Sequence, residues 1–427
     1  MPTSETQVRA LPLGTAGMKK ILILSGNRLA PAQTGGQVRS VSIARALARM
    51  GHEVRIFSIT GRKEDYRAAH LLRAETKHVE IEHRLSEDTH LGMTMGLVQA
   101  IVRRLKFPRV WQYWFLRRGV IPRHLEAALD TAEIVISDLP YCPPVPGPWR
   151  SKPWFLISHN LEHELLEQGG IRERLFAAWM RTVEGAAPQT YTDIFSCGEE
   201  DQAFFRAHDA TKKLIVPMIR CGVDPANYAV SDDVRRRTRR ELGLQDDEWV
   251  FLFSGSGFAP NVEAFEDIKE FCRREAAYLA KNRAHILVAG SVSSSSFREG
   301  SLIVTGRVPE VLPYFAAADA GLNMVTRGSG SNVKLFEYLA AKLPIISTPF
   351  GVRGTELNAA QDYLPCTREN LRDVIATVIA RPRRHWREHA EAVWVRHRRS
   401  CDIYALVDEA VGKFTVFQTE SIAILSG

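Results

Sequence analysis

The sequence predicts an α/β protein made of two doubly wound, Rossmann-like domains. Short apolar runs, typical of buried parallel strands, alternate with segments of helical periodicity along most of the chain. The alternation falls into two series, separated by a hinge near residues 218–226 that contains Gly222 and Pro225. Such alternation indicates an open sheet covered by helices on both faces. We therefore expect one parallel sheet in each half of the chain.

The first series begins with a strand over 19–25, a helix over 37–50 and a strand over 53–58. Together they form a βαβ unit, whose crossover should be right-handed. Helices rich in Arg, Lys, Trp and Phe are expected within 88–125. Further strands are expected at 132–138, 153–158, 193–196 and 213–217. We expect residues 1–17 to be a flexible leader and residues 18–220 to form the first domain.

The second series starts with a charged helix over 232–243. Its expected strands are 249–254, 285–290, 302–306, 320–325 and 343–347. Its expected helices are 262–279, 367–380 and 383–415. The second domain should therefore span 221–392.

Composition excludes several classes of protein. The chain has 427 residues, 45% of them hydrophobic and 25% charged, which is ordinary globular usage and rules out a disordered or collagen-like chain. It contains no run of about 18 apolar residues, so we expect no membrane span. The apolar run 21–24 is too short for a signal-peptide core, which favours a cytoplasmic protein. The net charge of +7 fits nucleic acid, an anionic membrane or a phosphorylated small molecule and selects none of them.

The cysteines indicate neither a zinc site nor a disulfide framework. The chain has six of them, no two form a CxxC motif, and no His pair completes a ligand set. We expect free thiols and no metal.

Two glycine-containing loops follow strands and precede helices, where backbone amides can approach an anion. The first contains Gly35 and Gly36 but lacks the GxGxxG spacing of a dinucleotide site, and the pair could equally serve only to permit a turn. The second runs through residues 326–332 into a helix. Lys334 lies in the first turn of this helix, where a cation opposes the helix dipole, and this suggests a bound anion. Glu337 shares its face, so a simple Lys–Glu surface pair is the alternative.

In order and spacing, these segments resemble the GT-B glycosyltransferases of glycosyltransferase family 4, which are retaining enzymes that use nucleotide-sugar donors. The segments that carry the resemblance are Thr34-Gly-Gly36 and residues 45–54, 253–261, 304–319, 328–340 and 344–348. The resemblance implies that the two domains face a cleft. It also implies a C-terminal helix, residues 393–427, that returns to the first domain with Trp394 as a packing anchor.

The resemblance also implies roles for individual residues. Glu337 would bind the ribose, Lys334 and the amides of 330–333 the diphosphate, and His159 would lie beside the transferred sugar. The implied catalytic residues are His159, Lys334 and Glu337. The implied donor-binding residues are Gly35, Gly36, Ser254, Gly255, Gly306, Arg307, Val308, Arg327, Gly328, Ser329, Gly330, Ser331, Asn332, Val333, Lys334 and Glu337. Asp138, Asn160 and Glu162 are candidates for the acceptor side.

Two departures from the family pattern affect the donor site. Ser329 stands where the family usually has its first glutamate. Residues 255–261 lack the usual Arg and Lys, so Lys334 and Arg307 would supply the positive charge. The sequence also lacks a DxD motif, so we expect no metal and no cofactor apart from the nucleotide-sugar substrate.

The implied function is transfer of a sugar to a glycan, lipid-linked or other glycoconjugate acceptor in surface polysaccharide biosynthesis. A nucleotide-sugar epimerase of the same architecture and a non-catalytic partner protein, suggested by Ser329, are the alternatives. An NAD-dependent oxidoreductase is disfavoured by the missing glycine fingerprint.

Three smaller features leave alternatives open. Residues 103–118 mix cations with aromatics and could lie on an anionic membrane face, or pack their aromatics inward with the arginines in solvent. His159 could instead cap the helix that begins near Leu161. The arginines of 381–399 are expected on a solvated face, and no nucleic-acid-binding module is present.

Overall fold

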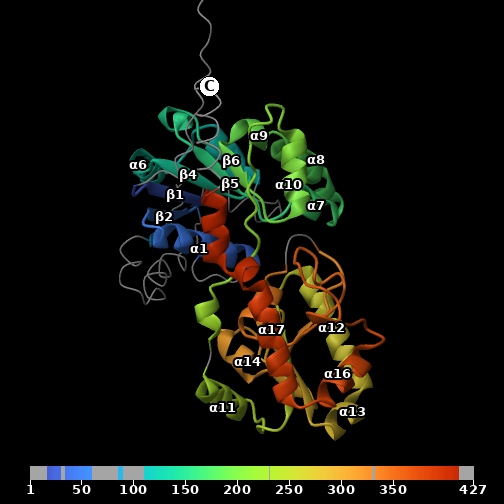
Figure 1. Ribbon diagram of the computed structural model, residues 1–427. Coiled ribbons are helices and arrows are strands. Elements are labelled where there is room, and N and C mark those ends of the chain that lie inside the picture. Colours follow the sequence, from blue (N-terminus) through green and yellow to red (C-terminus); the bar gives the residue numbers. More distant parts are fainter. Residues whose placement is uncertain are drawn as a thin grey trace, which may run out of the picture. The chain divides into compact units, whose positions relative to one another are not determined.

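The computed structural model describes residues 17–29, 34–59, 85–89, 110–229, 231–328 and 332–412. The chain divides into two compact units, each with its own sheet (Figure 1). The first unit comprises Met1–Ala32, Gly36–Ile219 and Tyr404–Gly427, and the second Gln33–Gly35 and Arg220–Ile403. The predicted fold class is confirmed, since both sheets are doubly wound and the end of the chain rejoins the first unit.

The sheet of the first unit has six parallel strands. Their order is β3 (Leu85–Thr89), β2 (Glu53–Ser58), β1 (Lys20–Ser25), β4 (Ile134–Asp138), β5 (Trp154–Ile157) and β6 (Asp193–Phe195). The strand order reverses between β1 and β4. In an open α/β sheet this is the point at which ligands bind, beyond the carboxyl ends of the strands.

Helices cover this sheet, and a buried apolar core lies between the sheet and the helices. The helices are α1 (Gly35–Arg49), α5 (Val110–Arg117), α6 (Arg123–Thr131), α7 (Glu162–Glu167), α8 (Ile171–Gly185), α9 (Ala187–Thr190), α10 (Glu199–His208) and the 3₁₀ turn Pro148–Ser151. The core includes Leu24 of β1, Val135 of β4 and Leu156 of β5, all with at most 1% of their surface exposed.

The strand expected at 213–217 does not form, and this prediction is wrong. The backbone N–H groups of Ile215 and Val216 donate to the carboxylate of Asp193 at 2.9 Å each. A side chain thus takes the hydrogen bonds that a neighbouring strand would need. Val216 also has a φ of 46°, which interrupts an extended backbone.

The second unit contains a seven-stranded sheet. Its order is β13 (Tyr363–Pro365), β12 (Ile345–Ser347), β11 (Ala320–Asn323), β7 (Trp249–Ser254), β8 (Ala284–Ala289), β10 (Leu302–Val304) and β9 (Phe297–Glu299). All neighbours are parallel except β9 and β10. The order reverses between β7 and β11, which defines a second expected binding point. The helices are α11 (Asp232–Glu241), α12 (Ala259–Arg274), α13 (Ala276–Lys281), α14 (Leu312–Ala317), α15 (Val333–Ala340), α16 (Leu371–Ile379), α17 (Arg383–Cys401) and the 3₁₀ turn Pro225–Tyr228.

The closing helix is interrupted, whereas the sequence predicted one helix over 383–415. α17 ends at Cys401. At this point the backbone N–H of Val223 donates to the Cys401 carbonyl oxygen at 2.8 Å, and the Val223 carbonyl oxygen accepts from the backbone N–H of Ile403 at 3.1 Å. Gly222 permits this approach, because a Cβ there would lie 2.9 Å from the Cys401 carbonyl oxygen. Helical backbone resumes over 403–412, and the chain passes to the first unit at Tyr404 rather than at 393.

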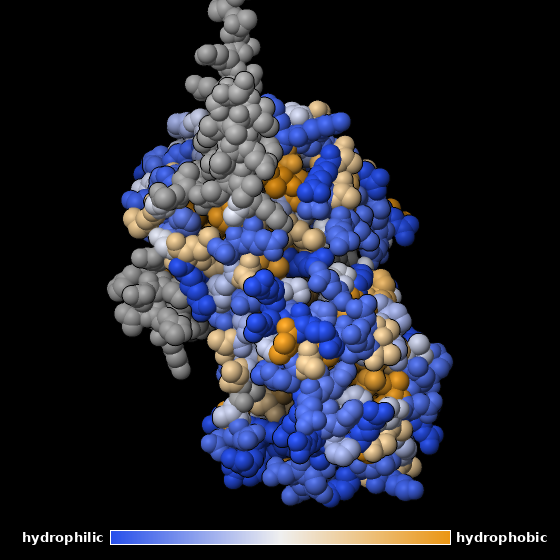
Figure 2. All heavy atoms as spheres, viewed as in Figure 1, coloured by the Kyte–Doolittle hydropathy of each residue, from blue (hydrophilic) through white to orange (hydrophobic). Residues whose placement is uncertain are grey.

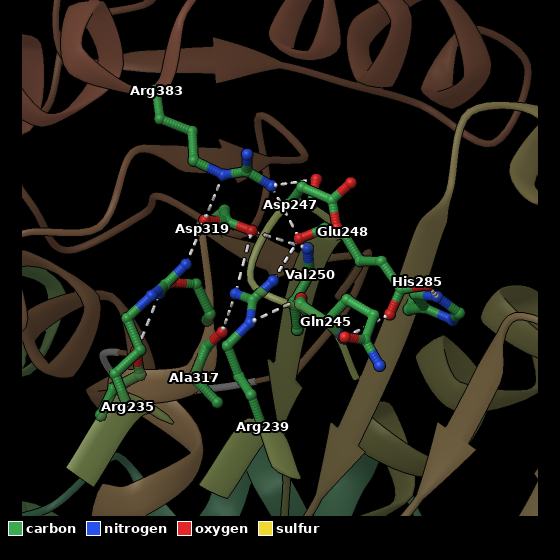
Figure 3. A network of polar contacts seen from close by, with 12 residues as sticks. Arg235, Arg239, Gln245, Asp247, Glu248, Val250, His285, Ala317, Asp319 and Arg383 are labelled. Carbon is green, nitrogen blue, oxygen red and sulfur yellow. Dashed lines mark hydrogen bonds and ion pairs between the residues drawn. The ribbon is translucent and has the colours of Figure 1, made fainter. Parts of the chain in front are cut away.

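Asp319 organises a buried charge network at the amino ends of β7 and β11 (Figure 3). Its carboxylate accepts from Arg235 at 2.6 Å, from Arg383 at 3.0 Å and from the backbone of Val250 at 2.9 Å. Arg239, which is fully buried, lies 3.5 Å from the same carboxylate. Burial lowers the pKa of Arg239 to about 10 even though Asp319 raises it. This network is structural, because it occupies the edge of the sheet opposite the carboxyl ends.

Surface polarity, membrane spans and cysteines can be compared with what the sequence predicted. The visible face of the second unit is mostly hydrophilic (Figure 2). Arg384, Arg387 and Arg398 of α17 are exposed, as expected for the arginines of 381–399, whereas Arg383 is half-buried in its ion pair with Asp319. No helix in the described ranges is long and apolar enough to cross a bilayer. All six cysteines are buried free thiols, as predicted.

Candidate functional site

The described part of the predicted donor site is formed by α15, which packs against the switch point of the second sheet. Tyr338 fixes this helix, because its hydroxyl lies 2.9 Å from the carbonyl oxygen of Leu252 in β7 and 3.0 Å from that of Leu322 in β11. The ring needs Gly321, where a Cβ would lie 2.4 Å from the ring. The first turn of α15 is thereby fixed near the carboxyl ends of both strands.

Lys334 is a buried cation in this first turn. Only 6% of its surface is exposed, its ammonium donates to the Oδ1 of Asn261 at 2.8 Å, and it lies 4.2 Å from the centre of the Phe253 ring. Within the described ranges no ion pair joins it to a carboxylate. Burial lowers the pKa of Lys334 from 10.5 to about 7, although Glu337 raises it. An ammonium this poorly compensated is suited to receive an anion.

Glu337 lies one turn further along α15 and is half-buried. Its Oε1 accepts from the hydroxyl of Tyr228 at 2.9 Å. Burial raises the pKa of Glu337, and the Tyr228 hydrogen bond and Lys334 partly offset that effect. The alternative, a surface pair of Glu337 with Lys334, does not form, since Lys334 donates to Asn261 and Glu337 accepts from Tyr228.

Glycines bring two loops close together beside this helix. Gly255 follows β7, and its carbonyl oxygen would lie 2.5 Å from a Cβ at Gly290, whose φ is 111°. Gly306 has a φ of 66°, and a Cβ there would lie 2.9 Å from the backbone of Ser295. Both positions therefore require glycine, which keeps these loops compact. Arg307 is exposed and Val308 half-buried next to Gly306.

The other predicted donor-binding residues do not all lie in one site: some are exposed or paired elsewhere, and three lie outside the described residues. Arg327 is half-exposed and makes a two-pronged ion pair with Glu263 of α12, with one contact at 2.6 Å. Gly328 has a φ of 135°, and Asn332 donates to the Gly351 carbonyl at 3.4 Å. Ser329, Gly330 and Ser331 lie outside the described residues. Ser254 ends β7, Val333 begins α15 and Gly35 begins α1.

A second polar cluster lies at the switch point of the first sheet. Asp138, the last residue of β4, is buried and accepts from Ser25 of β1 at 2.6 Å, from Ser40 of α1 at 2.6 Å and from Nε2 of His159 at 2.8 Å. Burial raises the pKa of this carboxyl, but the three donors outweigh it and the net shift is downward. Gly36 packs on the His159 ring, since a Cβ there would lie 3.6 Å from the ring Cγ.

The acceptor-side candidates differ in whether their side chains are already hydrogen-bonded within the protein. Asp138 is occupied by the three donors just described. The side-chain nitrogen of Asn160 is buried and has no partner among the described residues, so it remains able to donate. Glu162 accepts from the hydroxyl of Tyr141 at 3.1 Å.

His159 does not cap the helix that follows it, so that alternative is wrong. α7 begins at Glu162, and the carboxylate of Glu184 accepts from the backbone of Glu162 at 2.7 Å and of His163 at 3.1 Å. Glu184 also binds Nδ1 of His163 at 2.6 Å. Sequence reasoning missed Glu184, because it lies 22 residues away, near the C-terminal end of an amphipathic helix.

Within the described ranges, no group of three or more His, Cys, Asp or Glu side chains is arranged to hold a metal ion.

Comparison with known families and structures agrees with this geometry. The family described as "Glycosyl transferases group 1" matches residues 248–380, which carry the Lys334 site. A sequence search of curated proteins gives no match.

Solved structures show the same fold at low identity. Anabaena HepE in complex with UDP and glucose is 12% identical, with 93% of this chain and 100% of that chain covered and a TM-score of 0.62. WaaG, a glycosyltransferase involved in lipopolysaccharide biosynthesis, is 16% identical, with 92% and 99% covered and a TM-score of 0.55. A variant of S. aureus TarM in complex with fondaparinux, alpha-GlcNAc-glycerol and UDP is 9% identical, with 93% and 100% covered and a TM-score of 0.61. The chain therefore has the GT-B fold, and its residues 248–380 match the family of group 1 glycosyltransferases.

Proposed function

We propose that the chain transfers a sugar from a nucleotide-diphosphate sugar to a glycan, lipid-linked or other glycoconjugate acceptor. The observation that carries this proposal is Lys334, a buried ammonium in the first turn of α15 whose partners among the described residues are an amide oxygen and a ring face. A diphosphate would supply the missing negative charge, and the backbone amides at the start of the helix would add hydrogen bonds to it.

Glu337 suits the ribose of the same donor. Its carboxylate accepts one hydrogen bond, from Tyr228, and a carboxylate has capacity to accept several more. Two neighbouring hydroxyl groups on a ribose match that capacity. The UDP bound by the structural neighbours HepE and TarM supports a nucleotide donor.

The proposed mechanism is electrostatic. As the bond from the sugar to the diphosphate breaks, negative charge develops on the leaving phosphate. Lys334 and the start of α15 would stabilise this charge more strongly in the transition state than in the ground state. We propose that this arrangement needs no divalent cation and that transfer retains the anomeric configuration, as in the family that the motifs resemble.

We further propose that the enzyme acts in surface polysaccharide biosynthesis, in the cytoplasm or at the inner face of the membrane. The part of 103–118 that the structure describes gives this location partial support. Trp111 and Tyr113 of α5 pack inward, as the alternative reading of this segment predicted, while Trp114 is 45% exposed beside Arg118. Co-sedimentation with vesicles of anionic phospholipid tests the location, with Trp114→Ala as the matched variant.

Two measurements test the proposed reaction. Thermal melting in the presence of a panel of nucleotides and nucleotide-diphosphate sugars should show stabilisation by at least one of them, because a ligand that binds only the native state raises the melting temperature. Lys334→Met should lose this stabilisation. Lys342→Met should keep it, since Lys342 lies just after the same helix but pairs on the surface with Glu391 at 2.8 Å.

The products separate the proposed reaction from its alternatives. Release of free nucleotide that depends on acceptor supports a transferase. Formation of a new nucleotide-sugar without acceptor would instead identify an epimerase, and binding without turnover of any acceptor would identify a non-catalytic partner. Equal donor binding by Lys334→Met and the unmodified protein would overturn the proposed site.

A further inference from the structure

Arg39 of α1 is a fully buried arginine whose donors are all used by the first unit. Its Nε and Nη2 donate to the carbonyl oxygen of Ile219 at 2.9 and 2.7 Å. Nη1 donates to the Ser158 carbonyl at 2.8 Å, and Nη2 donates to the Ser196 carbonyl at 3.0 Å. The remaining contact joins Nη1 to Nδ1 of His159 at 3.1 Å. Five contacts match the five N–H groups of a guanidinium.

The contact between Arg39 and His159 fixes where the imidazole carries its proton. A guanidinium has no lone pair and can only donate, so Nδ1 of His159 must be the acceptor. The proton of the neutral ring is then on Nε2, which donates to Asp138 at 2.8 Å and lies 3.0 Å from the Ser40 hydroxyl. A proton on Nδ1 would face the N–H of Arg39 without an acceptor.

We propose that Arg39 is a positioning residue for the proposed transfer: it holds His159 in the Nε2–H form, and through the ring it fixes the first turn of α1 at Gly36. Both ring nitrogens are engaged within the protein, so His159 does not act as a general base. The ring face instead lies against Gly36, and the Ser40 hydroxyl is 3.1 Å from the Gly36 carbonyl oxygen. The first turn of α1, which carries the predicted donor-binding residue Gly36, is therefore held rigid. This role rests on the proposed function.

The groups around the ring favour this arrangement. Asp138 from β4 provides the only carboxylate that the structure shows bonded to His159, and Ser25 from β1 and Ser40 from α1 hold that carboxylate in place. The charge of Arg39 also acts on Asp201 of α10. It lowers the pKa of the Asp201 carboxyl, although burial raises this pKa by a larger amount. The position of Arg39 is thus fixed by three backbone carbonyl groups, independently of any substrate.

Nitrogen NMR of the protein labelled at histidine tests the inference without reference to turnover. His159→Gln assigns the signal. In the wild type we expect the His159 signals of a protonated Nε2 and an unprotonated Nδ1 acceptor. A protonated Nδ1 in the wild type would overturn the proposal. This result does not depend on whether glycosyl transfer is found, so the failure of the proposed function can be distinguished from the failure of this inference.

Substitution of Arg39 tests its effect on the reaction. Arg39→Met should release the ring to a mixture of tautomers and lower kcat about tenfold or more, the scale of a lost orientation in an active site. The KM for donor should change less than about threefold, since Lys334 and Glu337 of the second unit would still bind the donor. Arg39→Lys, which restores a donor to Nδ1, should recover part of kcat. Arg55→Met, a half-exposed arginine of β2, is the control and should resemble the wild type. A folded Arg39→Met variant with the tautomer and kcat of the wild type would refute the assignment.

Discussion

Replacement of Lys334 by Met should stabilise the ligand-free protein while removing donor binding. The pKa of Lys334 falls from 10.5 to about 7 because the ammonium is buried. At about 1.4 kcal/mol for each pH unit, this difference corresponds to a cost of about 5 kcal/mol for keeping the charged form in the native state at neutral pH. Local relaxation reduces that figure, so we expect Lys334→Met to raise the free energy of unfolding by on the order of 2–4 kcal/mol. Met is also apolar and suits the contact with Phe253.

The stability difference between Lys334→Met and the wild type should depend on pH in a defined direction. Below about pH 7, Lys334 is charged in both the native and the unfolded state, and the whole cost is present. Between about 7 and 10.5 the unfolded state binds a proton that the native state does not, so the free energy of unfolding of the wild type rises with pH. The advantage of the Met variant should therefore be largest near pH 6 and should shrink toward pH 10.

Urea unfolding at several pH values, with Lys342→Met as control, measures this effect. The surface pair of Lys342 should contribute less than about 1 kcal/mol at any of these pH values. A Met variant that is less stable than the wild type near pH 6 would refute the reasoning, because it would mean that Lys334 already has its counter-charge within the folded chain.

Three further substitutions have expected outcomes. Glu337→Gln should raise the KM for donor about tenfold, since a neutral amide accepts weaker hydrogen bonds than a carboxylate, and steady-state kinetics measures this. Asp319→Asn should lower the free energy of unfolding by about 3 kcal/mol, because buried Arg239 loses its carboxylate, and calorimetric titration should find donor affinity unchanged. Burial raises the pKa of Asp201 to about 7, so above this pH the native state carries an unfavourable buried charge. Asp201→Asn should therefore raise the melting temperature most near pH 8, with a gain that shrinks toward pH 4.

The central strands of both sheets and the edge strand β6 could be predicted from the sequence, and the other three edge strands could not. Buried parallel strands are continuous apolar runs, and β2 and β7 have the predicted bounds. β3 has the sequence Leu-Ser-Glu-Asp-Thr, and β9 and β13 have three residues each, so none of them carries an apolar signal. The apolar run at 213–217 misled in the opposite direction, because a side chain 20 or more residues earlier takes its hydrogen bonds.

The residue types of the candidate site were predictable, and their partners were not. The sequence was sufficient to predict where the strands end, where the glycine-containing loops lie and that α15 carries a cation in its first turn. The sequence does not reveal that Asn261 binds Lys334 across 73 residues, or that Tyr228 reaches Glu337 across 109. Such pairs depend on tertiary packing between elements that have no periodic relation. Arg39 was overlooked for a related reason: it lies among the apolar residues of a helix, where an arginine is usually exposed.

The two switch points use opposite electrostatic arrangements, and each suits its proposed task. In the first unit, the polar groups compensate one another: the Arg39 donors, both His159 nitrogens and the Asp138 oxygens all have partners. Such a network is rigid and gains nothing from a ligand. In the second unit, the buried ammonium of Lys334 makes no ion pair with a carboxylate of the described residues, and burial lowers its pKa. Binding energy is therefore available at the Lys334 site, where the diphosphate would bind. A donor that has lost its sugar still carries phosphate charge, so release of the nucleotide would break the same Lys334 contact. Variants that weaken this contact should speed product release even as they slow the bond-breaking step.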